Sequence, residues 1–298
     1  MSKPVIAFIG LGNMGLPMAN NLAAAGFSVH GYDAACSEPN ELAHADIIAH
    51  TQLSDSVADA SVIFTMLPDG AVVLDVLKLI IDARDQSATI IDCSTIDIND
   101  AREAHRIATE NGHTFFDAPV SGGIKGAAAG TLTAMVGGHR DSLAILDSVL
   151  DCLFANIIYC GGAGNGQAAK ICNNMLLATT MIGASETFNL GEQLGLDAQT
   201  LFDVLSTSTG SCWAVNSYCP VPGVGPQSPA DNRFQPGFSS QMMLKDMKLT
   251  QAAANSTEVA TPLGAQSLAL YEAYVQQHGG SSDFSAIIKY LQTLQRQS

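Results

Sequence analysis

The sequence predicts an α/β protein, in which a doubly wound, mostly parallel sheet comes first and an all-helical domain follows, joined to it by a long helix. Three observations carry this prediction. A glycine-rich turn links the first apolar run to the first helical stretch, further apolar runs alternate with helical stretches, and the strand pattern stops near residue 163. We therefore expect two domains, residues 1–163 and residues 164–298.

The amino-acid composition and net charge exclude some classes of binding partner. The 298 residues include 47% hydrophobic residues and carry a formal net charge of -15, with no basic cluster, which argues against nucleic acid and anionic membrane. The seven cysteines form no CxxC pair and no histidines gather near them, so we expect reduced thiols and no metal site. The first strand begins close to Met1 and no long uncharged apolar stretch occurs, so we expect a cytoplasmic protein.

The first strand, Val5–Ile9, is an unbroken apolar run that ends in a G-x-G-x-x-G motif. The motif consists of Gly10, Leu11, Gly12, Asn13, Met14 and Gly15. Between a strand and a helix, the first glycine makes the turn, the second lets a pyrophosphate approach and the third lets helix and strand pack closely. The N–H groups at the helix start would face the phosphates. This context predicts a Rossmann-type dinucleotide-binding domain.

Asp33 follows the second expected strand, Ser28–Tyr32. An aspartate at a strand end is often only a turn residue, but this one has the spacing of the acid that binds the ribose hydroxyls. From Ala34 to Leu77 the chain contains no lysine or arginine. A 2′-phosphate would have no cationic partner there, so we expect NAD rather than NADP.

Further strands are expected at residues 61–67, 88–93, 115–116, 131–136 and 156–160. Ligands of a doubly wound sheet bind at the carboxyl ends of its strands. The residues at these ends are Leu67, Pro68, Ser94, Thr95 and Ser121. For the first four, the residues alone favour ordinary strand-to-helix turns, in which Thr95 or Asp97 caps a helix.

Ser121, Gly122 and Gly123 form a more specific pattern. Two glycines after a serine leave consecutive N–H groups unobstructed, and together with the hydroxyl these groups could form an uncharged nest for a small carboxylate. The alternative is a flexible turn.

The helical half opens with a run from Gly164 to about Leu194 that is long enough for both packing and dimerisation. One face of this run carries Lys170, Asn174, Leu177, Met181, Ala184 and Phe188, and such a stripe is normally buried. Lys170 either extends to water or is desolvated enough to handle a proton beside the Asn174 amide. Further helices are expected at 196–206, 239–254, 262–277 and 283–295, and Lys245 on the second of these is expected to face solvent.

Four segments together resemble the β-hydroxyacid dehydrogenase family over essentially the whole chain: residues 10–15, 117–123, 164–174 and Lys245-Asp246. Softer motifs resemble the members that act on 3-hydroxyisobutyrate. These are Ser211-Cys212-Trp213, residues 220–224, Gly237-Phe238 and residues 283–286.

The resemblance implies an NAD-binding domain and a helical substrate and oligomerisation domain, with the active site in the cleft and assembly into a homodimer or homotetramer. It implies that Lys170 is the catalytic acid/base, that Asn174 orients it, and that Ser121, Gly122 and Gly123 hold the substrate carboxylate. The cofactor contacts that it adds are Leu67, Pro68, Thr95 and Lys245, the last of which revises the solvent interpretation.

The implied reaction is the oxidation of 3-hydroxyisobutyrate to methylmalonate semialdehyde in valine degradation. Neutral Lys170 would take the hydroxyl proton while the hydride passes to NAD, and burial would lower the lysine pKa toward working pH. One alternative is a reductase of tartronate semialdehyde or another short β-hydroxyacid. A remoter one is a non-catalytic nucleotide-binding module, which the retained Lys170 argues against.

Overall fold

The computed structural model describes residues 3–35, 46–143 and 146–295, and the chain forms two compact units, Met1–Lys170 and Ile171–Ser298. The division falls within a single long helix, α8 (Asn165–Gln193). Cys36, one of the cysteines expected to be reduced, lies outside the described residues, whereas the other six cysteines are free thiols. None of the helices in these described ranges is apolar over a length sufficient to cross a membrane.

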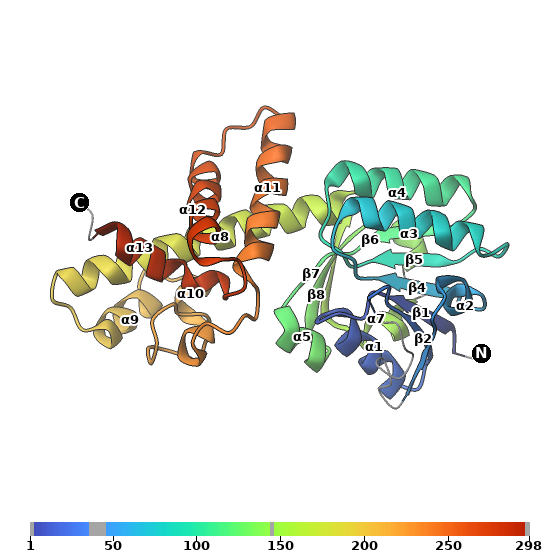
Figure 1. Ribbon diagram of the computed structural model, residues 1–298, viewed down its shortest axis with the longest axis horizontal. Coiled ribbons are helices and arrows are strands. Elements are labelled where there is room, and N and C mark those ends of the chain that lie inside the picture. The colour runs from blue at the N-terminus through green and yellow to red at the C-terminus, as the bar shows by residue number, and fades with distance from the viewer. Residues whose placement is uncertain (1–2, 36–45, 144–145, 296–298) are drawn as a thin grey trace. The chain divides into compact units, whose positions relative to one another are not determined.

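The first unit is built on one sheet (Figure 1). Its strands are β1 (Val5–Ile9), β2 (Ser28–Tyr32), β3 (Ile47–Ala49), β4 (Val62–Thr65), β5 (Thr89–Asp92), β6 (Thr114–Asp117), β7 (Val120–Ser121), β8 (Leu132–Gly137) and β9 (Phe154–Gly161). The order is β3-β2-β1-β4-β5-β6-β8-β7, with β9 beside β8, and β1 to β6 are parallel. From β1 the strand order runs outward in one direction to β2 and β3 and in the other direction to β4, β5 and β6. Sheets of this kind bind nucleotides at the point between β1 and β4 where the strand order reverses.

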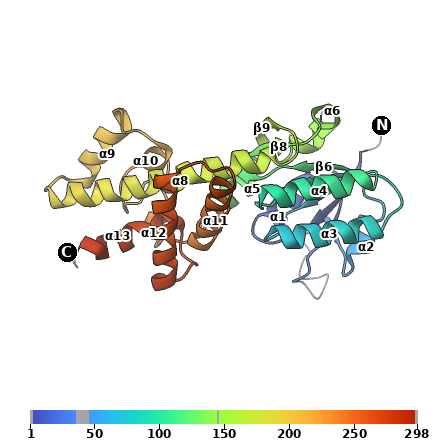
Figure 2. The same ribbon diagram turned by 90° about the horizontal axis from the view of Figure 1, so that it is seen from above.

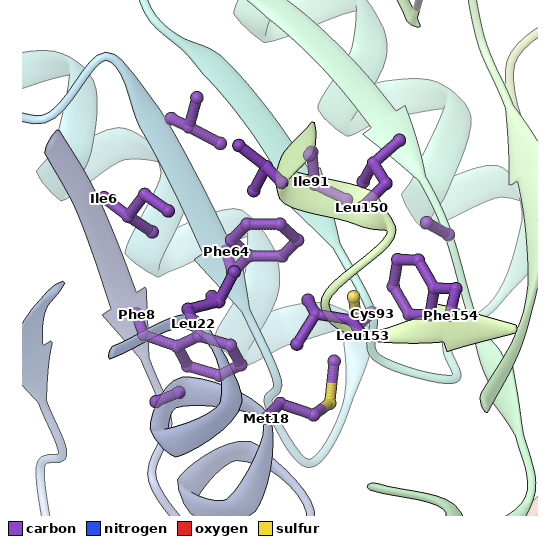
Figure 3. Close-up of a cluster of buried hydrophobic side chains, with 14 of the residues drawn as sticks. Ile6, Phe8, Met18, Leu22, Phe64, Ile91, Cys93, Leu150, Leu153 and Phe154 are labelled. Atoms are coloured by element: carbon purple, nitrogen blue, oxygen red, sulfur yellow. The ribbon is translucent and has the colours of Figure 1, made fainter. Parts of the chain in front are cut away.

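Helices cover both faces of this sheet. They are α1 (Gly15–Ala24), α2 (Leu53–Val57), α3 (Gly70–Asp82), α4 (Ile98–Glu110), α5 (Gly123–Ala129), α6 (Arg140–Leu143) and α7 (Asp147–Leu150). Ile6 and Phe8 point to the face covered by α1, where Met18 and Leu22 join them in one core (Figure 3). Ala7 and Ile9 point to the other face, in the core that α3 and α4 complete. This alternation along a buried strand explains why its sequence is apolar throughout.

The second unit is mostly helical, and α8 is one unbroken helix (Figure 2). The other elements of this unit are α9 (Ala198–Thr207), α10 (Trp213–Asn216), α11 (Ser240–Ser256), α12 (Pro262–His278), α13 (Ile287–Gln295) and two 3₁₀ turns, Pro229–Asn232 and Phe284–Ala286. The core contains Met181 and Phe188 of α8 together with Met243 and Met247 of α11. The predicted fold class is therefore confirmed, and so is the buried stripe on α8, apart from Leu177, which is only half-buried.

Three of the differences between the structure and the sequence prediction concern short strands and the start of the last helix. Strands β3 and β7 were not expected, because three and two residues are too few to show a strand pattern. The last helix was expected to begin at Asp283, but this residue caps a 3₁₀ turn and accepts a hydrogen bond from the Ser285 N–H. The α-helix itself begins at Ile287.

Candidate active site

The turn between β1 and α1 shows why two of its glycines are required. Gly10 has a φ of 91°, and a Cβ there would overlap the carbonyl oxygen of Met66 after β4. A Cβ on Gly15 would overlap the carbonyl oxygen of Gly10 itself and touch the ring of Phe8. Both glycines therefore allow α1 to begin tightly against the sheet.

Gly12 is different, because its surroundings are open. Among the described residues, no heavy atom outside its chain neighbours lies within 4 Å of a Cβ built there, and its φ is not in the left-handed region. The N-cap of α1, Met14, makes no side-chain capping hydrogen bond in the described structure. An exposed turn backbone and a helix start without a side-chain cap are suited to binding a pyrophosphate.

Asp33 lies beside this turn. Its Oδ2 accepts a hydrogen bond from the Leu11 N–H at 2.7 Å, and its Oδ1 accepts one from the Ala35 N–H at 2.8 Å. Because each carboxylate oxygen has two lone pairs, the group retains capacity to accept hydrogen bonds from ribose hydroxyls. The fold thus brings together the two features that the sequence predicted for a dinucleotide, the glycine turn and the acid.

The turns after β4 and β5 are tied to each other. The Leu67 N–H donates to Ser94 Oγ at 2.8 Å, which places the two predicted ligand-binding turns side by side. The N-cap of α4 is Asp97, whose side chain accepts from the Asn99 N–H, so Thr95 does not have that role. Leu67 and Thr95 are half-buried, and Pro68 is exposed.

Beneath these turns lies Asp92, which the sequence analysis did not single out because it reads as the end of an ordinary strand. It is fully buried, and its Oδ1 accepts from Ser94 Oγ at 2.5 Å and from Thr65 Oγ1 at 2.7 Å. Its Oδ2 has no hydrogen-bond partner among the described residues. Burial raises the pKa of Asp92 from 3.8 to about 6, against the opposing effect of the Ser94 and Thr65 hydrogen bonds.

We expect Asp92 to make the protein less stable as the pH rises from about 4 to about 6. With a pKa raised in the folded state, the folded chain binds a proton that the unfolded chain has already released, so stability falls across this window. This shift in the pKa of Asp92 corresponds to a change of about 3 kcal/mol in the free energy of unfolding. Urea unfolding of Asp92→Asn and wild type over this range measures the difference, with the exposed Asp82→Asn as control. An unchanged pH slope in Asp92→Asn would contradict the expectation.

The serine–glycine pattern forms a defined turn from β7 into α5. Gly122 and Gly123 have φ values of 134° and 62°, and Gly122 is the N-cap of α5. Within the described structure, no side chain makes a capping hydrogen bond there. Consecutive residues with positive φ before N–H groups that no side chain caps are suited to an anion nest.

Lys170 is buried near this turn. The residue is only 7% exposed, and its Nζ donates a hydrogen bond to the Val120 carbonyl oxygen at 2.7 Å. Val120 directly precedes Ser121 in β7. The interpretation in which Lys170 extends to solvent is therefore wrong.

The first turn of α8 is held by two buried residues that sequence reasoning did not assign. Asp117 Oδ1 accepts from the Gly164 N–H at 2.9 Å and is hydrogen-bonded to His105 Nε2, while Oδ2 accepts from the Gln167 N–H at 3.0 Å. The Gln167 side chain is bonded to the turn after β5. Asp117 and Gln167 both lie in segments that carry the family resemblance, so the sequence contained a signal that could have identified them. His105 lies outside these segments, and no sequence signal indicated it.

In the second unit, Asn174 is 2% exposed and held by hydrogen bonds. Its Nδ2 donates to Asp246 Oδ2 of α11 at 2.5 Å, and its Oδ1 accepts from Asn173 Nδ2 at 2.9 Å. Asp246 thus sets the orientation of the amide, a role that spacing along the chain could not indicate. Lys245, next to it, is half-buried.

Comparisons with known proteins cover nearly the whole chain. Residues 5–162 match the family described as the NAD binding domain of 6-phosphogluconate dehydrogenase, and residues 164–291 match the one described as NAD-binding of NADP-dependent 3-hydroxyisobutyrate dehydrogenase. The probable 3-hydroxyisobutyrate dehydrogenase of Mycobacterium tuberculosis is 47% identical over 286 residues, which is 96% of this chain and 97% of that protein. The mitochondrial 3-hydroxyisobutyrate dehydrogenase of Mus musculus is 40% identical over 97% of this chain and 88% of its own length.

Solved structures agree with these relatives. The Mycobacterium tuberculosis 3-hydroxyisobutyrate dehydrogenase with L-serine superimposes with a TM-score of 0.92 at 46% identity, covering 97% of this chain and 99% of that one. A 3-hydroxyisobutyrate dehydrogenase from Salmonella typhimurium, with a TM-score of 0.82 at 24% identity over 97% of this chain and 100% of that one, shares the fold. From the motifs, the fold and this similarity, we conclude that the chain belongs to the β-hydroxyacid dehydrogenase family and resembles its 3-hydroxyisobutyrate dehydrogenases.

Proposed function

We infer that this chain is an NAD-dependent 3-hydroxyisobutyrate dehydrogenase, which oxidises 3-hydroxyisobutyrate to methylmalonate semialdehyde in valine degradation. The observation that carries this inference is 40–47% identity to relatives of that name over 96–97% of the chain. The buried Lys170 supports an active enzyme rather than a non-catalytic nucleotide-binding module, because it supplies the proton-transferring group that the reaction needs.

The first unit fits the NAD cofactor. The open backbone at Gly12 leaves room for the pyrophosphate, and Asp33, which is hydrogen-bonded to the same turn, is proposed to bind the adenosine ribose. NAD is favoured over NADP because no lysine or arginine occurs between residues 34 and 77 to pair with a 2′-phosphate. When bound, NAD supplies the acceptor for the hydride that leaves the alcohol carbon. We assign further cofactor contacts to Leu67, Pro68, Thr95 and Lys245.

Lys170 is proposed as the general acid/base. As a neutral amine it has one lone pair and two N–H groups, and the hydrogen bond to the Val120 carbonyl occupies one N–H. In the forward direction Nζ takes the proton of the substrate hydroxyl, and in the reverse direction the ammonium returns it. Asn174, one helical turn further along α8, is proposed as the orienting neighbour, held in its rotamer by Asp246.

Ser121, Gly122 and Gly123 are proposed to bind the substrate carboxylate. The uncapped N–H groups at the start of α5 and the serine hydroxyl supply donors without a net charge. Binding of the carboxylate at one point fixes the position of the reacting alcohol carbon, and such orientation contributes a large part of enzymatic acceleration.

The test is the initial rate of NADH formation, followed by absorbance, with 3-hydroxyisobutyrate, L-serine, glycerate and NADP in parallel reactions. We expect rapid turnover of 3-hydroxyisobutyrate with NAD and much slower turnover with NADP. Fastest NADH formation with glycerate, whose oxidation is the reverse of tartronate semialdehyde reduction, would replace the substrate assignment by the related short β-hydroxyacid. Binding of NAD without turnover of any of these acids would indicate the non-catalytic module.

A homodimer or homotetramer is proposed from one face of α8. Leu176 and Leu190 lie on that face and are largely exposed, as is Leu194 just after the helix, and exposed large apolar side chains of this kind are typical of a subunit contact. Light scattering of the purified protein tests this, and the mass of a single chain would contradict it.

A cytoplasmic location is also proposed. Its support is the set of free thiols, including the buried Cys93 and Cys219, which suits a reducing compartment. Cell fractionation with detection of the protein tests it, and recovery from a membrane or an exported fraction would contradict it.

A further inference from the structure

Gln167 is a buried amide whose two ends are both bonded to one turn. The residue has no exposed surface and lies in the first turn of α8. Its Nε2 donates to the Ser94 carbonyl oxygen at 2.8 Å, and its Oε1 accepts from the Ile96 N–H at 3.1 Å. A donor and an acceptor in one side chain thus hold the backbone on both sides of Thr95. We call this pair of hydrogen bonds the Gln167 clamp.

The clamped turn is connected to the proposed cofactor contacts. Thr95 lies between the two backbone groups that the clamp binds, and the Leu67 N–H donates to Ser94 Oγ. The same Oγ donates to the buried Asp92, which Thr65 also bonds, so the turns after β4 and β5 share a buried anchor. A displacement of the turn after β5 would therefore be transmitted to both cofactor contacts.

The other side of the clamp leads to Lys170. The Gln167 N–H is bonded to the buried Asp117 carboxylate, which fixes the start of α8 to the end of β6. Lys170 follows three residues later on the same helix, and its Nζ is bonded to the Val120 carbonyl. Residues three apart on a helix share a face and move together, so a shift of Gln167 displaces Lys170.

We propose that Gln167 is a positioning residue that couples occupation of the cofactor turns to the placement of Lys170. This inference rests on the proposed roles of Leu67, Thr95 and Lys170. Order imposed on the turn after β5 by NAD is passed through the clamp to the first turn of α8. The coupling is reciprocal, so the same contact that orders Lys170 when NAD binds also strengthens NAD binding.

The first test is hydrogen–deuterium exchange with and without NAD. In the wild type, NAD is expected to slow exchange both in residues 94–96 and in residues 164–170. In Gln167→Met, which keeps the length of the side chain and removes both hydrogen bonds, NAD is expected to protect residues 94–96 alone. Equal protection of both segments in the variant and the wild type would overturn the proposal, and this readout does not depend on catalysis.

The second test separates the kinetic constants. For Gln167→Met we expect the dissociation constant for NAD to rise and kcat to fall, each by roughly 10-fold, because two buried backbone groups lose their partner. KM for the hydroxyacid is expected to change little, because both hydrogen bonds of the clamp go to the turn after β5 and not to Ser121, Gly122 or Gly123. Unchanged NAD affinity and kcat would overturn the coupling, and so would an increase confined to KM.

Three further variants make these tests decisive. Gln167→Glu keeps the acceptor for the Ile96 N–H but buries a carboxylate opposite the Ser94 carbonyl oxygen, so a loss at least as large is expected. Gln167→Asn, which keeps a polar amide but is one methylene shorter and cannot hold both partners, replaces Gln167→Met if that protein does not fold. Gln193→Met, an exposed glutamine at the other end of α8, is the matched control and should behave as wild type. If Lys170→Ala keeps its activity, the acid/base role of Lys170 is contradicted. If Gln167→Met nevertheless loses the NAD-dependent protection of residues 164–170, the coupling through the clamp is still supported.

Discussion

Replacement of Lys170 by alanine is expected to lower kcat by about 10²- to 10⁴-fold, the usual contribution of a positioned general acid or base. The dissociation constant for NAD is expected to stay within about 2-fold, because the glycine turn and Asp33 do not involve this side chain. The physical reason is that the side chain is buried and its amine is held by the Val120 carbonyl, so no solvent-exposed group can replace it. Steady-state kinetics and NAD titration measure the two effects separately.

Two further lysine variants sharpen this experiment. Lys170→Arg keeps the positive charge but cannot take the proton, because a guanidinium stays protonated, so it should be nearly as inactive as alanine. Lys78→Ala removes an exposed lysine that pairs with Asp75 and should be fully active. Retention of more than about a tenth of wild-type kcat by Lys170→Ala would show that Lys170 is not the acid/base, since the effect would lie below the general range.

The second large effect is a contrast between two glycines of the same turn. Gly15→Ala is expected to destabilise the fold by about 1–3 kcal/mol or more, because the new Cβ overlaps the Gly10 carbonyl oxygen and backbone must move. Gly12→Ala is expected to leave the unfolding midpoint near that of the wild type, because, apart from its chain neighbours, the new methyl meets no heavy atom of the described residues within 4 Å. The same methyl would occupy the space proposed for the pyrophosphate, so NAD affinity should fall by about 10-fold or more.

Thermal unfolding without cofactor and titration with NAD distinguish the two variants. A Gly12→Ala protein that binds NAD as tightly as the wild type would show that the cofactor does not approach this turn. A Gly15→Ala protein as stable as the wild type would show that α1 can shift away from β1 without loss. The pair separates a glycine required by the fold from a glycine required by the ligand.

The elements that could be predicted from sequence are those with a local signature. The run Val5–Ile9, the glycine turn and the α8 stripe each depend on residues close together in the chain, so spacing alone indicates them. The two-part fold follows from the change from apolar runs to helical periodicity. The short strands β3 and β7 could not be found in this way, because they form only by pairing with β2 and β8.

The features of the candidate site also divide into those with a local sequence signature and those that depend on tertiary contacts. The sequence by itself indicated the candidate residues, which are the dinucleotide turn, Asp33 and Lys170, because each lies in or at the expected spacing from a recognisable motif. Only the tertiary structure decided how they are held: Gln167 bonds Ser94 across 73 residues of chain, and Asn174 bonds Asp246 across 72. A buried polar group must find a hydrogen-bond partner, but that partner is chosen by which turns the folded sheet and helices bring together, and no pattern along the chain records that choice.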